Sequence, residues 1–373
     1  MERIAITDNP AKIVEIGRDL LNEKSKIYTD AMLKQIMRVI DSYAADASDD
    51  EKQSILLRSI YDYWVYGNNI AEEFYFHFAE KSHEEKRTYI SFRERYAYIN
   101  HLNKKEDAHL LNDKYEAYKL FKPYYKRELI QLAGQEDYDS FLGFVERHPV
   151  FVAKPPDLGL AIGVHKVDSS EYPDKQELFE QLLRESIDVK NSHKWGGREK
   201  PSVVLEELIC QAEALARIHP QSVNSIRATT IRTGGRVHIY HPWFKIGADG
   251  NFVTSAAFGT LDAGINVGNG IVETPGFKEN GLSFEYHPQT GLRIPGYRIP
   301  EWDGLVKLAT TLAESLENIN YVGWDLVLTP DGWCVMEGNY SGEFMWQMVY
   351  EKGMKADFED LIGWKPDKQF WWE

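Results

Sequence analysis

Cysteine is scarce in this sequence. Cys210 and Cys334 are the only two in 373 residues. Two cysteines give no disulfide framework, and their separation fits no zinc-knuckle spacing. Each lies in an apolar, strand-like stretch, which predicts ordinary burial in the core for both. A reducing compartment, by default the cytoplasm, is therefore the expected location.

Long apolar runs and an excess of basic residues are also lacking. No run of about eighteen apolar residues occurs, so no membrane-spanning helix is expected. The first residues, "MERIAITDNPAKIVEIGRDLL", are too polar for a signal peptide. The formal net charge of −15 argues against nucleic-acid binding, which needs clustered Lys and Arg. A small anionic substrate in a local basic pocket remains compatible with this charge.

The pattern of apolar residues predicts an α+β protein with a helical N-terminal region. Spacings of three and four residues predict helices from about Ala11 to Lys119, with one helix start in "ASDDEKQ" and an aromatic stripe that should form core. Beyond Lys122 the pattern changes to short strands, such as the "VFVAK" run. A hairpin is expected around "TGG", a long loop region from 248 to 300, and an amphipathic helix in "WDGLVKLATTLAESLENI".

A second hairpin follows that helix, and it carries polar side chains at its open end. Pro330, Asp331 and Gly332 separate two apolar runs and predict a three-residue loop. The predicted pairs are Thr329 with Trp333, Val327 with Val335, and Asp325 with Glu337. Asn339, two residues beyond Glu337, should face the same way.

Opposed carboxylates at this position would repel each other, since their Cβ atoms would lie about 5 Å apart. A divalent cation removes the repulsion, and the oxygen set of Asp325, Glu337 and Asn339 suits Mg²⁺. Two alternatives remain open. The carboxyl pair could share one proton, or a four-residue loop could shift the register and separate the two groups.

Two further motifs fit a nucleotide. Lys154 ends an apolar strand before a glycine-containing loop whose backbone N–H groups could approach anions. The strand "VVLEELI" could offer its edge to adenine, with Ile209 against the ring and Glu213 near the ribose hydroxyls. Each motif has an ordinary alternative. Lys154 could be a solvated surface lysine, and "VVLEELI" could be a core strand that ends in polar residues.

The ordered set of Lys154 with its loop, "LEELI", "GWDLVLTPDG" and "VMEGN" resembles the ATP-grasp superfamily, over Leu110 to Trp364. The resemblance implies a helical domain over 1–109, an N-lobe with the phosphate loop over 110–200, and a C-lobe with the metal site over 201–373. It implies ATP and Mg²⁺ as ligands. The implied contacts are Asp325, Glu337 and Asn339 to metal, Lys154 to phosphate, Glu206, Glu207 and Ile209 to adenine, and Glu213 to ribose.

A narrower resemblance is to the ATP-grasp branch associated with sugar transfer and polysaccharide synthesis. "RIHPQSVNSIRATTIRTGG" is similar to that branch, and Arg227, Arg232 and Lys245 match its basic positions. It implies that Arg227 contacts phosphate or a developing acyl-phosphate. Four departures follow. Gly323 stands where D-alanine–D-alanine ligases have an arginine, and the first ATP lysine is either Lys114 or Lys119. The segment "TSAAFGTLDAGINVGNG" matches the branch's Asp-Asn and Gly-Gly loop poorly, and helices replace the usual preceding α/β domain.

The leading functional hypothesis is an ATP-dependent ligase in polysaccharide or small-metabolite biosynthesis. It would activate a small-molecule carboxylate as an acyl-phosphate for attack by an amine, with Lys154, Arg227 and Arg232 as catalytic cations. A kinase that phosphorylates a sugar hydroxyl is the second hypothesis, because Gly323 replaces the ligase arginine. The third is a non-catalytic nucleotide-binding partner, with the tail "KQFWWE" as a candidate contact surface. Homo-oligomerisation stays open.

Overall fold

The structure is a computed structural model that describes residues 4–192, 199–250 and 259–367. The tail from 368 to 373 and the start of the loop at 251–258 lie outside the described residues. The helices are α1 Pro10–Glu23, α2 Asp30–Tyr43, α3 Asp49–Tyr66, α4 Ile70–Tyr75, α5 His83–Lys86, α6 Arg95–Leu102, α7 His109–Asn112, α8 Lys114–Tyr125, α9 Tyr138–Arg147, α10 Lys175–Ser192, α11 Glu213–Ala216, α12 Trp302–Glu314, α13 Trp346–Val349 and α14 Lys355–Ile362. The strands are β1 Leu129–Leu132, β2 Val150–Lys154, β3 His165–Asp168, β4 Val203–Glu207, β5 Ser225–Thr233, β6 Arg236–Ile246, β7 Leu261–Gly264, β8 Gly276–Phe277, β9 Ser283–Phe284, β10 Tyr321–Thr329 and β11 Gly332–Asn339.

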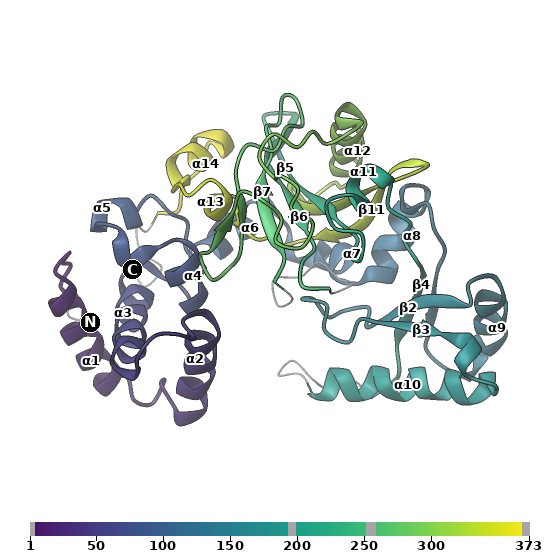
Figure 1. Ribbon diagram of the computed structural model, residues 1–373, viewed down its shortest axis with the longest axis horizontal. Coiled ribbons are helices and arrows are strands. Elements are labelled where there is room, and N and C mark those ends of the chain that lie inside the picture. The colour runs from purple at the N-terminus through teal and green to yellow at the C-terminus, as the bar shows by residue number, and fades with distance from the viewer. Residues whose placement is uncertain (1–3, 193–198, 251–258, 368–373) are drawn as a thin grey trace.

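The N-terminal helices form a bundle beside the rest of the molecule (Figure 1). As predicted, a helix starts in "ASDDEKQ": α3 begins at Asp49 behind a capping box of Ser48 and Glu51. Helices α1 and α3 approach closely at Gly17, where a Cβ atom would lie 2.1 Å from the carbonyl oxygen of Leu57. None of the helices in the described part of the chain is long and apolar enough to cross a membrane.

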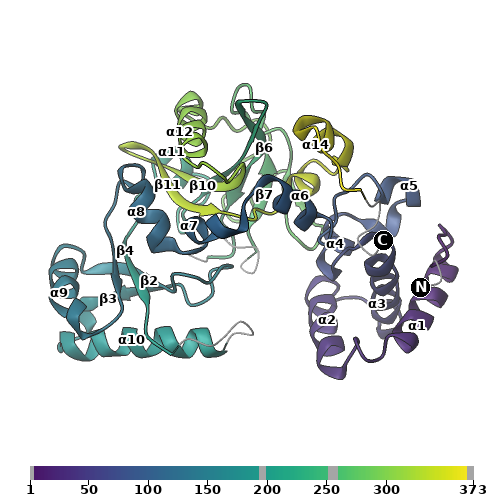
Figure 2. The same cartoon turned by 180° about the vertical axis from the view of Figure 1, so that it is seen from behind.

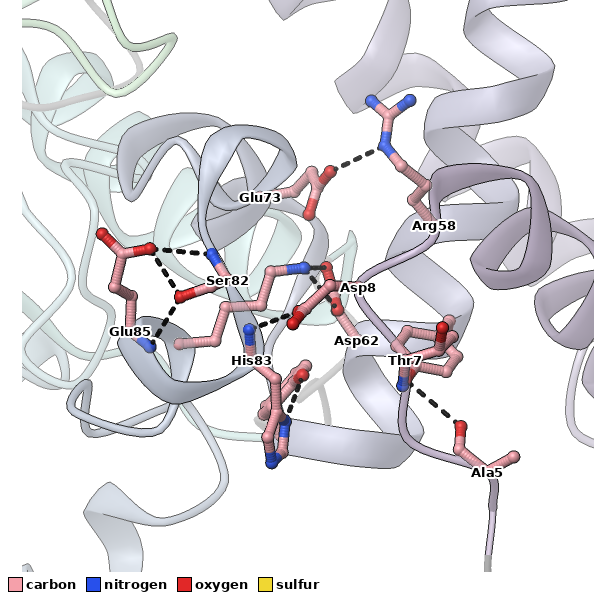
Figure 3. Close-up of polar contacts among 12 residues, drawn as sticks. Ala5, Thr7, Asp8, Arg58, Asp62, Glu73, Ser82, His83 and Glu85 are labelled. Atoms are coloured by element: carbon pink, nitrogen blue, oxygen red, sulfur yellow. Dashed lines mark hydrogen bonds and ion pairs between the residues drawn. The ribbon is translucent and has the colours of Figure 1, made fainter.

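Polar contacts join the helical segments inside this bundle (Figure 3). Lys86 donates to both oxygens of the buried Asp62 at 3.1 Å, and Arg58 pairs with Glu73 at 3.2 Å. The predicted aromatic stripe is core, as expected. Its buried members include Tyr75, Phe76, Phe78 and Tyr89.

A four-stranded antiparallel sheet follows, in the order β1-β4-β2-β3. Helices α9 and α10 pack on it through a cluster that includes Phe141, Phe151 and Phe179. The expected strand "VFVAK" is β2, whereas β1 was not predicted. Because β4 lies inside this sheet, the sheet extends past the expected boundary between residues 200 and 201.

A seven-stranded antiparallel sheet forms the other half, in the order β11-β10-β5-β6-β7-β8-β9. The expected hairpin at "TGG" is present, because β5 and β6 join through Gly234 and Gly235, both with positive φ. Helix α12, predicted as amphipathic, buries Leu305, Ala309 and Leu312 against the sheet. Figure 2 shows this sheet beside the smaller one, with α10 beneath the smaller sheet.

The register of the β10–β11 hairpin corrects the prediction. Thr329 pairs with Gly332, so the loop has two residues, and the predicted pairs Thr329–Trp333 and Val327–Val335 are wrong. A β-bulge at Met336 adds one residue to β11 and restores the predicted pair of Asp325 with Glu337.

The cysteine prediction was correct for one residue of two. Cys334 on β11 is buried. Cys210 is exposed, because β4 ends at Glu207 and Cys210 falls in the following loop instead of the sheet interior. The apolar run "VVLEELI" is therefore only partly strand.

Candidate active site

A cavity of about 390 Å³ lies where the two sheets face each other. One wall comes from the β2–β3 loop and the end of β4, and the other comes from β5, β6, β7, β10 and β11. The volume falls within the usual range of ligand pockets. Several of the predicted site residues line it, namely Lys114, Lys154, Glu206, Glu207, Ile209, Arg227, Asp325, Glu337 and Asn339.

At the four-stranded sheet, Lys154 forms an ion pair with Glu206 across β2 and β4. The same carboxylate pairs with Arg127, which also donates to the backbone oxygens of Tyr125 and Val335. Burial alone would raise the pKa of Glu206, but the two cations outweigh it and lower the pKa to about 2. Burial, the largest effect, lowers the pKa of Lys154, and the nearby charges of Arg127 and Lys114 add to this, whereas the ion pair with Glu206 opposes it. Glu206 therefore positions Lys154 at the cavity wall.

The β2–β3 loop carries backbone strain beside Lys154. Leu160 and Ala161 both have a φ of 56°, a left-handed conformation that side chains other than glycine adopt rarely. Lys114, the first residue of α8, donates to the backbone oxygen of Leu158 at 2.6 Å. Its ammonium also lies 3.3 Å from Glu337 across the cavity. Lys114 thus contacts both the β2–β3 loop and the β10–β11 hairpin.

On the seven-stranded sheet, Asp325 is 2% exposed and its two oxygens accept from Arg227 at 2.7 and 3.0 Å. Lys245 on β6 lies 3.6 Å from the same carboxylate. Burial alone would raise the pKa of Asp325, but the charges of Arg227 and Lys245 lower it below its ordinary value. Asp325 is thus an ionised carboxylate in a cationic setting.

The predicted metal ligands share one face. Asp325 pairs with Glu337 in the hairpin register, and Asn339 pairs with Gly323. The amide nitrogen of Asn339 donates to the backbone oxygen of Gly323 at 3.1 Å and lies 3.4 Å from Asp325. The three residues line the cavity, and their oxygen donors fit Mg²⁺ in chemistry. In the structure, Arg227 and Lys245 lie beside the carboxylate of Asp325, and Lys114 lies beside that of Glu337.

Gly323 makes room for Arg227. A Cβ atom at Gly323 would lie 3.2 Å from the Cδ atom and 3.3 Å from the Nη1 atom of Arg227. The guanidinium also lies over the ring of Trp243, 5.5 Å from its centroid. The space beside the glycine is therefore filled by an arginine that comes from β5.

Three predicted residues lie outside the cavity lining. Glu213 is exposed at the start of α11. Arg232 donates to Asn320 and to the backbone of Glu317 beyond the bulge in β5. Lys119 pairs with Glu116 on the exposed side of α8. Of the two candidate lysines, the structure places only Lys114 in the cavity.

Sequence reasoning missed several residues of the site. Arg127 precedes β1 without a motif, and its partner Glu206 is 79 residues away. The far end of the cavity is acidic, with Asp262, Glu279 and Glu343, and it also holds Arg95 from α6. A family match to "TSAAFGTLDAGINVGNG" would have been the only signal for Asp262, and that segment matches the branch pattern poorly.

The family model described as sugar-transfer associated ATP-grasp matches residues 93–361. This chain belongs to that family. The predicted resemblance and the ATP-grasp fold, with its antiparallel sheets and helical N-terminal region, are therefore confirmed. The match begins at Arg93, so α1 to α5 lie outside the family-defined part of the ATP-grasp protein.

Solved structures with a similar arrangement are distant. An ATP-grasp ligase, PsnB, complexed with a minimal precursor is 12% identical, with a TM-score of 0.42 over 70% of this chain and 62% of that one. A D-alanine–D-alanine ligase from Helicobacter pylori is 15% identical, with a TM-score of 0.42 over 71% and 64%. The chain thus spans less than two thirds of these proteins. No curated protein matches the chain.

Proposed function

We propose that this ATP-grasp protein is an ATP-dependent carboxylate–amine ligase. The observation that carries the proposal is the cavity itself. The cations Lys114, Lys154, Arg227 and Lys245 and the oxygen donors Asp325, Glu337 and Asn339 line one space between two sheets. Such a set suits the phosphates of a nucleotide, because phosphoryl transfer depends mainly on positioning and on charge stabilisation. The family description supports a role beside sugar transfer, as in polysaccharide biosynthesis.

ATP would lie along the cavity from β4 to β5. The edge after β4, with Glu207 and Ile209, is the proposed adenine contact, and Lys154 and Lys114 are proposed to hold the phosphates. Lys154 would act from a fixed position, because Glu206 holds its ammonium and Arg127 in turn holds Glu206. Such preorganisation lowers the cost of binding a charged group.

Asp325, Glu337 and Asn339 would hold magnesium. When bound, Mg²⁺ would draw charge from the phosphate oxygens. The chain's own contribution is to keep Asp325 ionised, since Arg227 and Lys245 lower its pKa. The cations that now neutralise these carboxylates would then be available to phosphate.

Arg227 is the proposed contact for the transferred phosphoryl group. A substrate carboxylate oxygen would attack the γ-phosphorus, and the bond to the β-phosphate oxygen would break to release ADP. The resulting acyl-phosphate would then react with an amine. The nitrogen forms a bond to the acyl carbon as inorganic phosphate leaves. Arg227, in the space beside Gly323, would take the place of the arginine that D-alanine–D-alanine ligases carry at that point.

A phosphate-release screen tests the proposal, with ATP, magnesium, carboxylates that include uronic acids, and amines that include amino sugars. We expect ADP and free phosphate only when both substrates are present, and a hydroxamate when hydroxylamine replaces the amine. A sugar kinase would instead leave phosphate on its acceptor. A non-catalytic partner would bind ATP without turnover.

Two variants of the hairpin test the site. Asp325→Asn and Glu337→Gln should each lower kcat about 100-fold, a typical effect of losing one electrostatic contact in a transition state. Asp331→Asn is the matched control, because Asp331 is exposed in the turn of the same hairpin. Glu337 is about one-third exposed, so its variant should fold normally. Normal turnover by Asp325→Asn and Glu337→Gln would overturn the assignment.

A further inference from the structure

The acidic end of the cavity contains an unsatisfied carboxylate. Asp262 on β7 is 7% exposed, and its Oδ1 atom is buried without a hydrogen-bond partner. Leaving a buried acceptor unpaired costs about 1–3 kcal/mol, and more when the group is charged. Because Asp262 lines the cavity, a ligand in the cavity can supply the missing donor.

The nearest strand neighbour of Asp262 compensates its charge only in part. Lys245 pairs with Asp262 in the β6–β7 register, yet its ammonium lies 3.6 Å from Asp325, toward the proposed phosphate end. Glu279 and Glu343 add further negative charge at the same end. Burial, the largest effect, and these two carboxylates raise the pKa of Asp262 to about 7, against Lys245 and Arg227. Arg95 also lines this end of the cavity, but within the described part of the chain it forms no ion pair with Asp262, Glu279 or Glu343.

The helical N-terminal region contributes to this wall. The hydroxyl of Tyr43, the last residue of α2, donates to Glu279 at 2.7 Å, although the two residues are 236 positions apart. The ring of Tyr43 packs edge-on against Phe74, with centroids 5.2 Å apart. Glu279 is therefore held in place from outside the family-defined part of the chain.

We propose that Asp262 and Glu279, with Glu343, form the subsite for the ammonium group of the amine substrate. The inference rests on the proposed ligase function and adds to it the place and charge of the second substrate. Tyr43 is a positioning residue that acts through Glu279.

An ammonium group fits this wall by charge and by hydrogen bonding. Its three N–H donors can satisfy the unpaired oxygen of Asp262 and a second carboxylate at the same time. A neutral hydroxyl acceptor would leave the mutual repulsion of the carboxylates in place. The subsite lies beyond Arg227 and Lys245, so the nitrogen would approach the acyl carbon beside the phosphoryl contact.

The reaction requires the ammonium to lose a proton before it attacks. Asp262 is the carboxylate with room to accept that proton on its unpaired oxygen. The proton passes from nitrogen to Asp262, and the nitrogen lone pair forms the C–N bond. The C–O bond to the phosphoryl group then breaks and phosphate leaves.

The test compares amines with their hydroxyl counterparts. Calorimetry on the full chain with Mg²⁺ and ADP would use glucosamine against glucose and ethanolamine against ethylene glycol. Steady-state assays would give the KM of the same amines and of ATP for Asp262→Asn, Glu279→Gln and Tyr43→Phe. Glu285→Gln is the matched control, because Glu285 is exposed and pairs only with Arg293 among the ion pairs of the described residues.

We expect amines to bind more tightly than their hydroxyl counterparts. Loss of one charged hydrogen bond should raise the amine KM about 10-fold or more in Asp262→Asn and Glu279→Gln, with a much smaller change in the ATP KM. Tyr43→Phe should raise the amine KM with kcat nearly unchanged, whereas a purely structural defect would lower kcat and the melting temperature instead.

Three results would overturn the inference. The first is equal binding of amines and alcohols, and the second is equal changes in the amine and ATP KM values in Asp262→Asn and Glu279→Gln. The third is an amine KM in these two variants that is the same as in the control Glu285→Gln. The hydroxamate assay on the unmodified protein separates this failure from failure of the ligase proposal. Hydroxylamine is largely neutral and reports acyl-phosphate formation without the ammonium subsite.

Discussion

Glu206→Gln is the substitution whose effect on stability follows most directly from the structure. The carboxylate of Glu206 is buried and pairs with two cations, Arg127 and Lys154, which are also buried. Glutamine keeps the shape but removes the charge, so both cations would remain in the interior without an anion.

The pKa of Glu206 sets the magnitude. A fall from 4.5 to about 2 corresponds to about 3 kcal/mol of stabilisation of the folded state by the ionised form. Because the folded pKa is depressed, this contribution is present above the unfolded pKa of 4.5. It is lost as the pH falls through about 2, and by pH 3 about 1 kcal/mol would remain. Breaking a buried pair typically costs about 3–5 kcal/mol, which agrees.

Urea unfolding at pH 7 and pH 3 measures the effect. We expect Glu206→Gln to lower the free energy of unfolding by about 3 kcal/mol or more at pH 7, and by less than half of that at pH 3. Glu128→Gln is the control, because Glu128 pairs with Arg147 near the surface, and it should cost less than about 1 kcal/mol. A loss in Glu206→Gln as small as the control, or one equal at both pH values, would refute the reasoning.

Two other substitutions have distinct signatures. Burial raises the folded pKa of Asp262 from 3.8 to about 7, so its stabilising contribution is complete below pH 3.8 and is lost as the pH rises through about 7. Thermal unfolding should therefore give Asp262→Asn a free energy of unfolding up to about 4 kcal/mol higher than that of the unmodified protein at pH 8, and little higher at pH 4. A gain in stability that does not depend on pH would contradict this. The charged groups that act on Asp262 are Lys245, Glu279, Glu343 and Arg227. Gly323→Ala should push Arg227 aside by a few tenths of an ångström. It should lower kcat about 10-fold and leave the melting temperature nearly unchanged. An unchanged kcat would show that Arg227 is not held beside Gly323.

Local chemistry made the second hairpin predictable. Pro330, Asp331 and Gly332 identify a turn, and alternation places Asp325 and Glu337 on one face. The loop length was wrong by one residue, and the bulge at Met336 compensated for it. A bulge depends on how β11 packs in the sheet, so turn residues alone do not reveal it.

The family also followed from ordered motifs that a single sequence displays. Lys154 at the end of β2 and Arg227 within β5 belong to these motifs, and both line the cavity. Glu213 and Arg232 were chosen by the same reasoning but lie outside it. Position along the chain does not determine which face a side chain occupies after a loop, as for Glu213, or after a bulge, as for Arg232.

The amino-acid sequence was sufficient for the α+β class, the hairpin and the oxygen face of Asp325, Glu337 and Asn339, because turn chemistry and strand alternation act over a few residues. Only the folded chain brings Arg127 to Glu206 and Tyr43 to Glu279. Charge pairing and burial act through space, and no local pattern encodes which distant side chain will share a low-dielectric cavity.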